Sequence, residues 1–315
     1  MGFKLMLTLR PYQIAEAAEF LRKGELVAFP TETVYGLGAP IFNSEAIAKI
    51  YLAKGRPSDN PLIAHIASLD QIHQIARDVP PEFYLLAEKF FPGPLTVVLK
   101  KQASVPPIVS GGLDTIAVRM PRHRIALELI AAAGEPLVAP SANLSGKPSS
   151  TTAQHVAADF EGKIAAVIDG GATEFGIEST VISLIGEPCL LRLGAVPQAE
   201  IEKVLGKPLA QPSAQSKLSS PGMRYRHYAP VAQVKLFACK DELDLYLEKA
   251  PEMRRLIVEE IKAFNLYAQL RRADEENAKE ILILVTPEML QNHALMDRLL
   301  KVETQVTTGH LSASS

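Results

Sequence analysis

Two cations lie close together in the segment Lys54-Gly55-Arg56, and two prolines, Pro57 and Pro61, follow it. Two cations on a stiff loop are typical of a site that binds phosphate or carboxylate groups. Gly55 would let the backbone approach a ligand, because glycine has no side chain to obstruct it. A solvated surface turn explains the two cations alone equally well, since charged loops are common on protein surfaces.

Polar side chains also follow two predicted buried strands. Thr31 and Thr33 come directly after the first of these strands, and Ser141 and Asn143 come after the second. Hydroxyl and amide groups at the end of a strand are well placed to hydrogen-bond a small ligand. Turn formation alone would still explain any single one of these hydroxyl groups.

Arg119 lies in the apolar segment 115–120, where a cation needs an anionic partner. A ligand carboxylate and a structural Asp or Glu are equally good candidates for that partner. Thr115 precedes Arg119 by an even number of residues, so both side chains point to the same face of the predicted strand. Arg192 likewise lies inside the apolar run 190–194.

Two segments resemble nucleotide-binding loops but lack required residues. Ile41 occupies the last glycine or alanine position of a dinucleotide fingerprint over residues 36–41. In the segment 141–148, Ser141 replaces the first glycine of a P-loop and Pro148 replaces its final Ser or Thr. We therefore predict neither motif.

The elements that must position these residues alternate between short apolar runs and helical patterns. The predicted strands cover residues 26–29, 62–66, 95–99, 115–120, 137–139, 166–171, 179–184 and 190–194. The predicted helices cover residues 12–23, 43–53, two short pieces of 71–91, 123–133, 152–160 and 197–205. Such alternation indicates an α/β fold.

Size and composition exclude several classes of protein. The chain has 315 residues, of which 47% are hydrophobic and 22% charged, with a net charge of -2 and two cysteines. These values are typical of two globular domains and argue against a disulfide framework, a zinc cluster or strong non-specific nucleic-acid binding. No apolar run approaches the length of a membrane span, so we predict a soluble cytoplasmic protein.

The chain changes character after residue 206. We predict a larger domain over residues 1–206, a linker over 207–230 and a small α/β domain over 231–315. The linker is rich in Pro, Ser and Gln, which is typical of spacers. Its end carries aromatic and cationic residues, which favours a linker that also contacts the active site.

Several stretches, taken together and in order, resemble the threonylcarbamoyl-AMP synthases, the YrdC-like family in its long two-domain form with an SPGM-type linker. The stretches are residues 30–37, 54–56 with 60–62, 140–143, 179–181, 192–194 and 220–228. The resemblance implies an open twisted mixed sheet with flanking helices, followed by a small Rossmann-like α/β domain.

The resemblance also implies a reaction. L-Threonine and bicarbonate would form a carbamate that attacks the α-phosphate of ATP, yielding threonylcarbamoyl-AMP and pyrophosphate for threonylcarbamoyladenosine modification of tRNA. A tRNA-modifying transferase would receive the product, whereas direct tRNA binding has weak support. Mg²⁺ would be held mainly by the ATP phosphates, with no metal site in the protein.

Site residues follow from the same resemblance. L-Threonine would be bound by Thr33, His65, Arg119 and Ser179. ATP would contact Arg56, Asn60, Thr115, Ala139, Ser141, Asn143, Ser149 and Arg192, with Arg224 and Tyr228 from the linker. Lys54 would lie at the phosphates, and Lys54 and Arg56 are the predicted catalytic residues. Attack on a phosphoryl group needs positioning and charge neutralisation more than a protein nucleophile.

Two other functions are open to the sequence. The cations and the tyrosines Tyr225 and Tyr228 would also suit a protein that binds RNA without catalysis. A general nucleotide hydrolase would consume ATP without threonine. Pyrophosphate release that requires both threonine and bicarbonate distinguishes the synthase from both alternatives.

Overall fold

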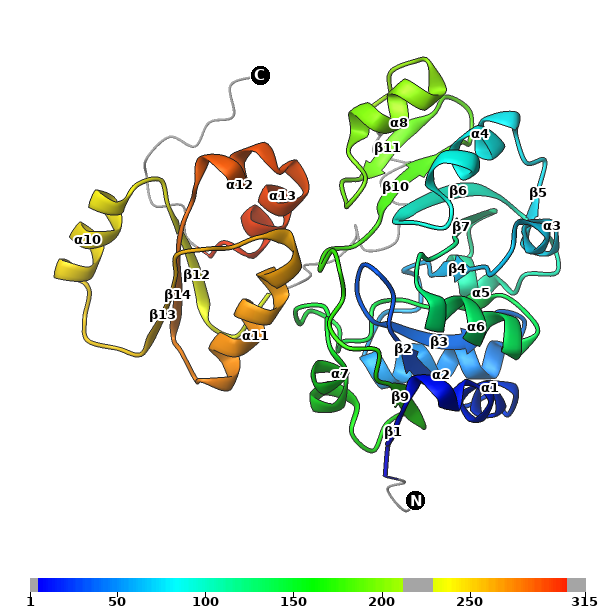
Figure 1. The fold of residues 1–315 in the computed structure, drawn as a ribbon, viewed down its shortest axis with the longest axis horizontal. Coiled ribbons are helices and arrows are strands. Elements are labelled where there is room, and N and C mark those ends of the chain that lie inside the picture. Colours follow the sequence, from blue (N-terminus) through cyan, green and yellow to red (C-terminus); the bar gives the residue numbers. More distant parts are fainter. Residues whose placement is uncertain (1–4, 212–228, 305–315) are drawn as a thin grey trace. The chain divides into compact units, whose positions relative to one another are not determined.

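The computed structural model describes residues 5–211 and 229–304, which form two compact units (Figure 1). The larger unit contains the described residues up to 145 and from 149 to 211, and the smaller contains 146–148 and 229–304. Arg224, Tyr228 and most of the predicted linker lie outside the described residues, so the predicted domain boundaries stay predictions. Within the described ranges, no helix is long and apolar enough to cross a membrane.

The larger unit is built on an 11-stranded mixed sheet, which confirms the predicted fold class. Ten strands follow one another in the order β1-β9-β2-β3-β8-β4-β7-β6-β10-β11, and β5 pairs with β6. The strands are β1 (Leu7–Leu9), β2 (Val27–Phe29), β3 (Gly36–Pro40), β4 (Ile63–His65), β5 (Ala76–Arg77), β6 (Leu95–Lys101), β7 (Thr115–Arg119), β8 (Leu137–Val138), β9 (Ala166–Ile168), β10 (Thr180–Ser183) and β11 (Cys189–Arg192). The sheet contains both parallel pairs, such as β4 with β7, and antiparallel pairs, such as β6 with β7.

Short helices connect these strands. They are η1 (Pro11–Gln13), α1 (Ile14–Arg22), α2 (Ser44–Lys54), η2 (Leu69–Gln71), α3 (Ile72–Ile75), α4 (Pro81–Phe90), α5 (Pro107–Ser110), α6 (Arg124–Ala133), α7 (Ala153–Phe160) and α8 (Gln198–Leu205). Helix α1 buries Ala17, Ala18 and Leu21, which recur at helical spacing and pack with Leu129 of α6.

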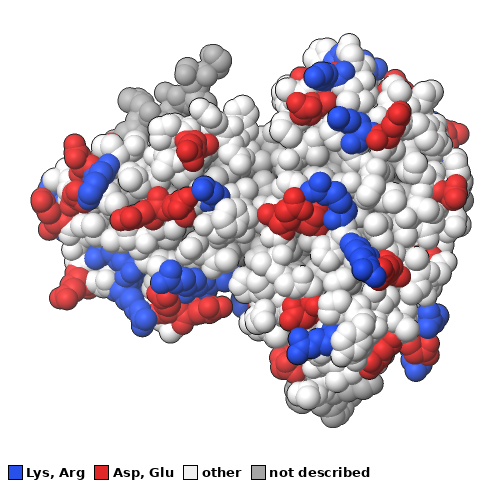
Figure 2. Space-filling model, in the orientation of Figure 1, with Lys and Arg blue, Asp and Glu red and all other residues white. Residues whose placement is uncertain are grey.

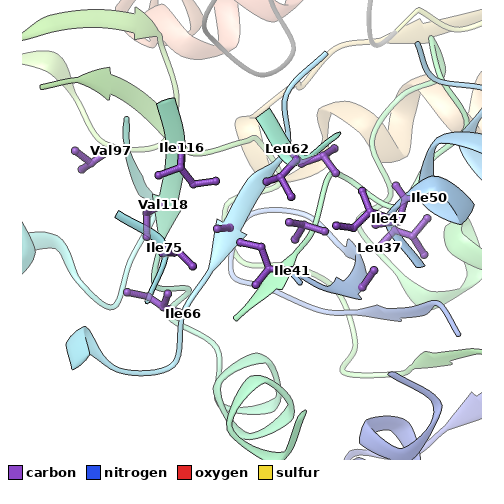
Figure 3. Packing of buried hydrophobic residues seen from close by; sticks show 14 of the residues in the cluster. Leu37, Ile41, Ile47, Ile50, Leu62, Ile66, Ile75, Val97, Ile116 and Val118 are labelled. Carbon is purple, nitrogen blue, oxygen red and sulfur yellow. The ribbon is translucent and has the colours of Figure 1, made fainter. Parts of the chain in front are cut away.

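The main core lies between α2 and the middle of this sheet. Ile47 and Ile50 of α2 belong to one buried cluster (Figure 3). The same cluster contains Leu37 of β3, Val118 of β7, and Leu62, which directly precedes β4. Burying each of these side chains contributes about 1.5–3 kcal/mol relative to exposure. The packing therefore fixes α2, and with it the position of the cationic segment at its end.

Both ends of α2 are specified locally. The side chain of Asn43 accepts a hydrogen bond from the Ala46 N–H at 3.0 Å and so caps the helix start, for which the sequence offers Asn43 or Ser44. At the other end Gly55 adopts a left-handed conformation with φ of 60°. The N–H groups of Gly55 and Arg56 donate to the carbonyls of Leu52 and Tyr51, which forms a Schellman motif. Gly55 is therefore required by the helix end, where a side chain would strain the backbone.

Three strands and one helix of the larger unit, β1, β3, β5 and α5, were not predicted from the sequence, and β5 lies within the segment 71–91 that was predicted to be helical. Strand β3 has the sequence Gly-Leu-Gly-Ala-Pro, which lacks the β-branched residues typical of strands, but it pairs with β2 and β8. Strand β1 and helix α5 contain only three and four residues. Strand β1 pairs with β9, far away in the sequence, and α5 packs against α2 as well as the nearby β7. Segments this short carry too little local pattern to be predicted.

The smaller unit contains a parallel three-stranded sheet in the order β12-β14-β13, which confirms a small α/β unit. Its elements are β12 (Gln233–Phe237), α10 (Lys240–Lys249), β13 (Arg255–Val258), η3 (Ala263–Asn265), α11 (Leu266–Glu275), β14 (Glu280–Leu284), α12 (Pro287–Gln291) and α13 (His293–Val302). Glu280 pairs with Lys235 and Arg255, each at 2.7 Å. Burial raises the pKa of Glu280, but hydrogen bonds from Lys235, Tyr246 and Arg255 outweigh this effect and bring the pKa to about 2.

Candidate functional site

His65 and Arg119 lie directly opposite each other on the adjacent parallel strands β4 and β7. Residues that are paired in register point to the same face of a sheet, so the imidazole and guanidinium groups share one face. Both side chains are buried, with 3% and 4% exposure. The sheet thus brings together two of the residues predicted to bind threonine.

His65 is neutral at physiological pH. Burial lowers its pKa to about 3, and the positive charge of Arg119 lowers it further in the same direction. Its Nδ1 lies 3.2 Å from the carbonyl oxygen of Ile63, which can only accept a hydrogen bond. A neutral ring that donates from Nδ1 presents Nε2 as an acceptor. His65 is therefore suited to accept a hydrogen bond from a hydroxyl group.

Arg119 has an acidic partner within the protein. Its Nη2 lies 2.8 Å from Oε2 of Glu32, and both side chains are almost completely buried. Its Nε donates to the carbonyl of Gly93 at 3.3 Å. Of the two partners that the sequence left open, the structure provides a carboxylate from the chain itself. Sequence reasoning missed Glu32, although it lies between the two threonines that drew attention to this loop.

A threonine turn holds Glu32 in place. The Thr31 hydroxyl donates to the carbonyl of Val34 at 2.6 Å and lies 2.9 Å from the Thr33 hydroxyl. The carbonyl of Glu32 accepts a hydrogen bond from the Phe175 N–H at 2.8 Å. Because Thr31 and Thr33 are buried, these bonds fix the backbone on both sides of the carboxylate.

A second group of predicted residues forms around Ser179. Its hydroxyl lies 2.7 Å from the Thr96 hydroxyl of β6. Arg192 donates from Nη2 to the carbonyl of Ser179 at 2.9 Å and to its hydroxyl at 3.2 Å. A Cβ on Gly194 would lie 2.3 Å from the Ser179 carbonyl carbon, so glycine is needed where these segments meet. The Ser149 hydroxyl donates to Glu178 at 2.7 Å, which brings Ser149 beside Ser179.

A third group forms around Lys54. Its buried ammonium group donates to the carbonyls of Ser141, at 2.6 Å, and Asn143. The carbonyl of Lys54 in turn accepts from the Ser145 N–H at 2.8 Å. Lys54 therefore holds the loop that follows β8, a role that the sequence did not suggest. Its predicted place at the phosphates, and its catalytic role, stay predictions.

The remaining ATP-binding candidates lie next to these groups. Arg56 donates from Nη2 to the Pro61 carbonyl at 3.1 Å, and Tyr51 donates to the Asn60 carbonyl at 3.2 Å. The Ala139 N–H donates to the Ile63 carbonyl of β4 at 3.0 Å. Thr115 begins β7, the strand that carries Arg119.

The sheet order relates the three groups to one another. Strands β8, β4, β7, β6, β10 and β11 are consecutive neighbours. Each of them except β6 carries or directly adjoins a predicted residue, and β6 contributes Thr96, whose hydroxyl contacts Ser179. Hydrogen bonds join Lys54 with Ser141 and Asn143, and Ser179 with Arg192, while the strand register joins His65 with Arg119. No group of three His, Cys, Asp or Glu residues that could hold a metal ion occurs in the described ranges.

Two family models match nearly the whole chain. One, described as "Telomere recombination", matches residues 19–194, and the other, described as "Threonylcarbamoyl-AMP synthase, C-terminal domain", matches residues 196–302. The chain is 44% identical to a Bacillus subtilis threonylcarbamoyl-AMP synthase, over 92% of each protein. It is 55% identical to the Pyrococcus abyssi threonylcarbamoyl-AMP synthase, over 72% of this chain and 68% of that one.

A solved structure is similar along the same length. The crystal structure of P. abyssi Sua5 complexed with L-threonine matches with a TM-score of 0.86 and 42% sequence identity. The match covers 96% of this chain and 100% of the other. Both units are therefore included in the similarity, which agrees with the two consecutive family matches.

Proposed function

Because this chain belongs to the threonylcarbamoyl-AMP synthase family in its two-domain form, we propose that it converts L-threonine, bicarbonate and ATP into threonylcarbamoyl-AMP and pyrophosphate. The register of His65 and Arg119 on neighbouring strands is the observation that carries this proposal. It puts a planar cation beside a neutral hydrogen-bond acceptor, which suits an amino acid with a side-chain hydroxyl.

Different residues bind different groups of L-threonine. The guanidinium of Arg119 binds the α-carboxylate, because its planar fork matches the two carboxylate oxygens. The neutral imidazole of His65 accepts the hydrogen bond of the threonine hydroxyl. Thr33 and Ser179 contribute further hydroxyl groups. The crystal structure of a similar protein in complex with L-threonine supports threonine as the ligand.

ATP is bound by a second set of residues. They are Arg56, Asn60, Thr115, Ala139, Ser141, Asn143, Ser149 and Arg192, together with Arg224 and Tyr228, which lie outside the described residues. Lys54 and Arg56 neutralise charge on the phosphates as the carbamate attacks. Lys54 also anchors the loop that holds Ser141 and Asn143.

Mg²⁺ accompanies the nucleotide in this proposal. The triphosphate and water hold the ion, because Mg²⁺ commonly keeps several waters and binds through substrate phosphates. The ion supplies charge neutralisation at the phosphates when bound. The product passes to a transferase that modifies tRNA, since a mixed anhydride of this kind hydrolyses if it is not used.

Pyrophosphate release tests this function directly. Wild-type protein should release pyrophosphate from ATP only when L-threonine and bicarbonate are both present. Arg56→Ala should lower this rate about 10²-fold or more, because a lost charge-assisted contact to reacting phosphates costs about 2–4 kcal/mol. Lys54→Ala should lower the rate at least as much, and it should also lower stability because two buried carbonyls lose their donor.

Three outcomes separate the candidate functions. ATP consumption without threonine would indicate a nucleotide hydrolase. Absence of turnover together with salt-sensitive RNA binding would indicate a binding protein. Wild-type rates in Arg56→Ala and Lys54→Ala would contradict the assignment of the catalytic residues while leaving the overall reaction intact.

A further inference from the structure

Glu32 combines deep burial with unused hydrogen-bonding capacity. Its side chain is 1% exposed, and neither carboxylate oxygen accepts a hydrogen bond from the described residues. The Nη2 of Arg119 lies 2.8 Å from Oε2, but the two groups are not aligned as a hydrogen bond, and this nitrogen has no other acceptor in the described part of the chain. The charges compensate each other while their hydrogen bonds remain available.

A purely structural ion pair rarely has this arrangement. Burying a carboxylate away from water is costly, and the interior normally offsets the cost with several hydrogen-bond donors as well as a counter-charge. The paired carboxylate Glu280 illustrates the usual solution, because it accepts from both Tyr246 and Arg255. Glu32 has the counter-charge without the donors, which indicates that a ligand supplies a donor.

The surroundings of Glu32 are those of the proposed substrate site. Arg119 connects it to His65, which lies in register on the neighbouring strand. Thr33, another residue assigned to threonine, follows Glu32 directly in the same hydrogen-bonded turn. His123 also lies near enough for the carboxylate to act on its pKa, which burial lowers and Glu32 raises.

The substrate itself requires a group of this kind. A free α-amino acid carries a carboxylate and an ammonium group on the same carbon atom. The residues assigned to threonine provide one guanidinium, one neutral imidazole and two hydroxyl groups, none of which is negatively charged. Building on the proposed function, we propose that Glu32 binds the α-ammonium group of L-threonine while Arg119 binds its carboxylate.

This arrangement selects a zwitterion. A net-neutral pair of opposite charges complements the net-neutral amino acid, with each charge facing its opposite. A hydroxy acid with the same carboxylate would leave Glu32 without a donor and close to a second anion. Glu32 is therefore a specificity-determining residue for amino acids over other carboxylic acids.

Binding of two ligands to two forms of the protein tests the proposal. Calorimetry would measure the affinities of the protein for L-threonine and for 3-hydroxybutanoate. The second ligand keeps the carboxylate and the hydroxyl group of threonine but lacks its ammonium group. Wild-type protein should prefer L-threonine by about 10- to 100-fold, the range expected for one charge-assisted hydrogen bond. Glu32→Gln should weaken L-threonine binding by a similar factor, whereas 3-hydroxybutanoate should bind equally well or more tightly because Arg119 loses its competitor.

The control is Glu174→Gln, which removes the same charge from an exposed ion pair with Arg122. It should leave both affinities unchanged. Equal weakening of both ligands by Glu32→Gln would overturn the proposal, because a structural role affects them alike. If Glu32→Gln does not fold, equal affinity of wild-type protein for both ligands would overturn it without any variant. Absence of L-threonine binding to wild-type protein would instead overturn the proposed function on which this inference rests.

Discussion

His65 is a buried histidine whose protonation is opposed by its surroundings. Its pKa is lowered to about 3 in the folded protein, chiefly by burial, from an ordinary value of 6.5. Between these pH values the unfolded chain binds a proton that the folded chain does not bind. The free energy of unfolding therefore rises as the pH increases from about 3 to 6.5. Above pH 6.5, His65 adds no further stability.

Substitution of His65 should change this pH dependence. Relative to His65→Asn, wild-type protein should lose about 2 kcal/mol of stability between pH 7 and pH 5, because one proton is worth about 1.4 kcal/mol per pH unit. Urea denaturation at several pH values measures the difference. His73→Asn, at an exposed histidine of α3, should follow the wild-type curve. A pH-independent difference between wild type and His65→Asn would contradict the buried neutral state.

Individual residues were predicted well where their role depends on local sequence. Asn43 and Ser44 were both candidates to cap the helix that begins there, and the structure assigns the cap to Asn43. Glu32 could not be identified, because no local pattern indicates which of 35 acidic residues pairs with Arg119. The anchoring role of Lys54 was hidden for the same reason, since its carbonyl partners lie 87 and 89 residues away.

At the scale of elements, helix α5 supports the loop that carries Asn60. Gly111 ends α5 in a left-handed conformation with φ of 59°, and a Cβ there would lie 2.4 Å from the carbonyl oxygen of Asp59. The Leu62 N–H donates to the Val109 carbonyl at 2.9 Å. The end of α5 therefore fixes the position of the loop from Arg56 to Pro61.

Gly111 and its neighbour Gly112 form a matched pair for testing this contact. Both have positive φ, but a Cβ on Gly112 would meet nothing within 4 Å. Gly112→Ala should cost about 1 kcal/mol from backbone strain alone. Gly111→Ala should cost about 1–3 kcal/mol more, because the methyl group displaces the Asp59 carbonyl, and it should also weaken ATP binding.

Chemical denaturation and nucleotide titration of the two variants give both quantities. Equal stability losses would mean that the loop moves away freely. If Gly111→Ala is destabilised but binds ATP with normal affinity, the loop does not belong to the nucleotide site.

Prediction of elements succeeded where burial and periodicity agree. The helices from residue 124 to 133 and from 153 to 160 match their predicted spans closely, because apolar residues recur at helical spacing and Thr152 caps the second. Strand β3 was missed because its glycines follow from tertiary contacts. A Cβ on Gly38 would lie 2.8 Å from the ring of Phe29, so close packing against β2 selects glycine in spite of its low strand propensity.

At the scale of the whole molecule, charge separates the synthase from an RNA-binding protein. The chain has 33 Lys and Arg residues against 35 Asp and Glu residues. On the face seen in Figure 2, blue and red side chains are interspersed and do not gather into one basic surface. Non-specific RNA affinity comes mainly from cations that release counterions from phosphates, and it requires several of them to act together.

We therefore expect tRNA to bind weakly and to be unnecessary for adenylate formation. In about 0.15 M salt, a mobility shift with roughly 10 µM protein should leave tRNA unbound, because a molecule with balanced charges releases few counterions. Pyrophosphate release measured with threonine, bicarbonate and ATP should keep the same rate when tRNA is added. Repeating the shift in low salt provides the control, since any residual electrostatic binding should strengthen there. Tight binding that persists in high salt, or a rate that rises with tRNA, would indicate a specific RNA surface and would make tRNA a direct partner of this protein.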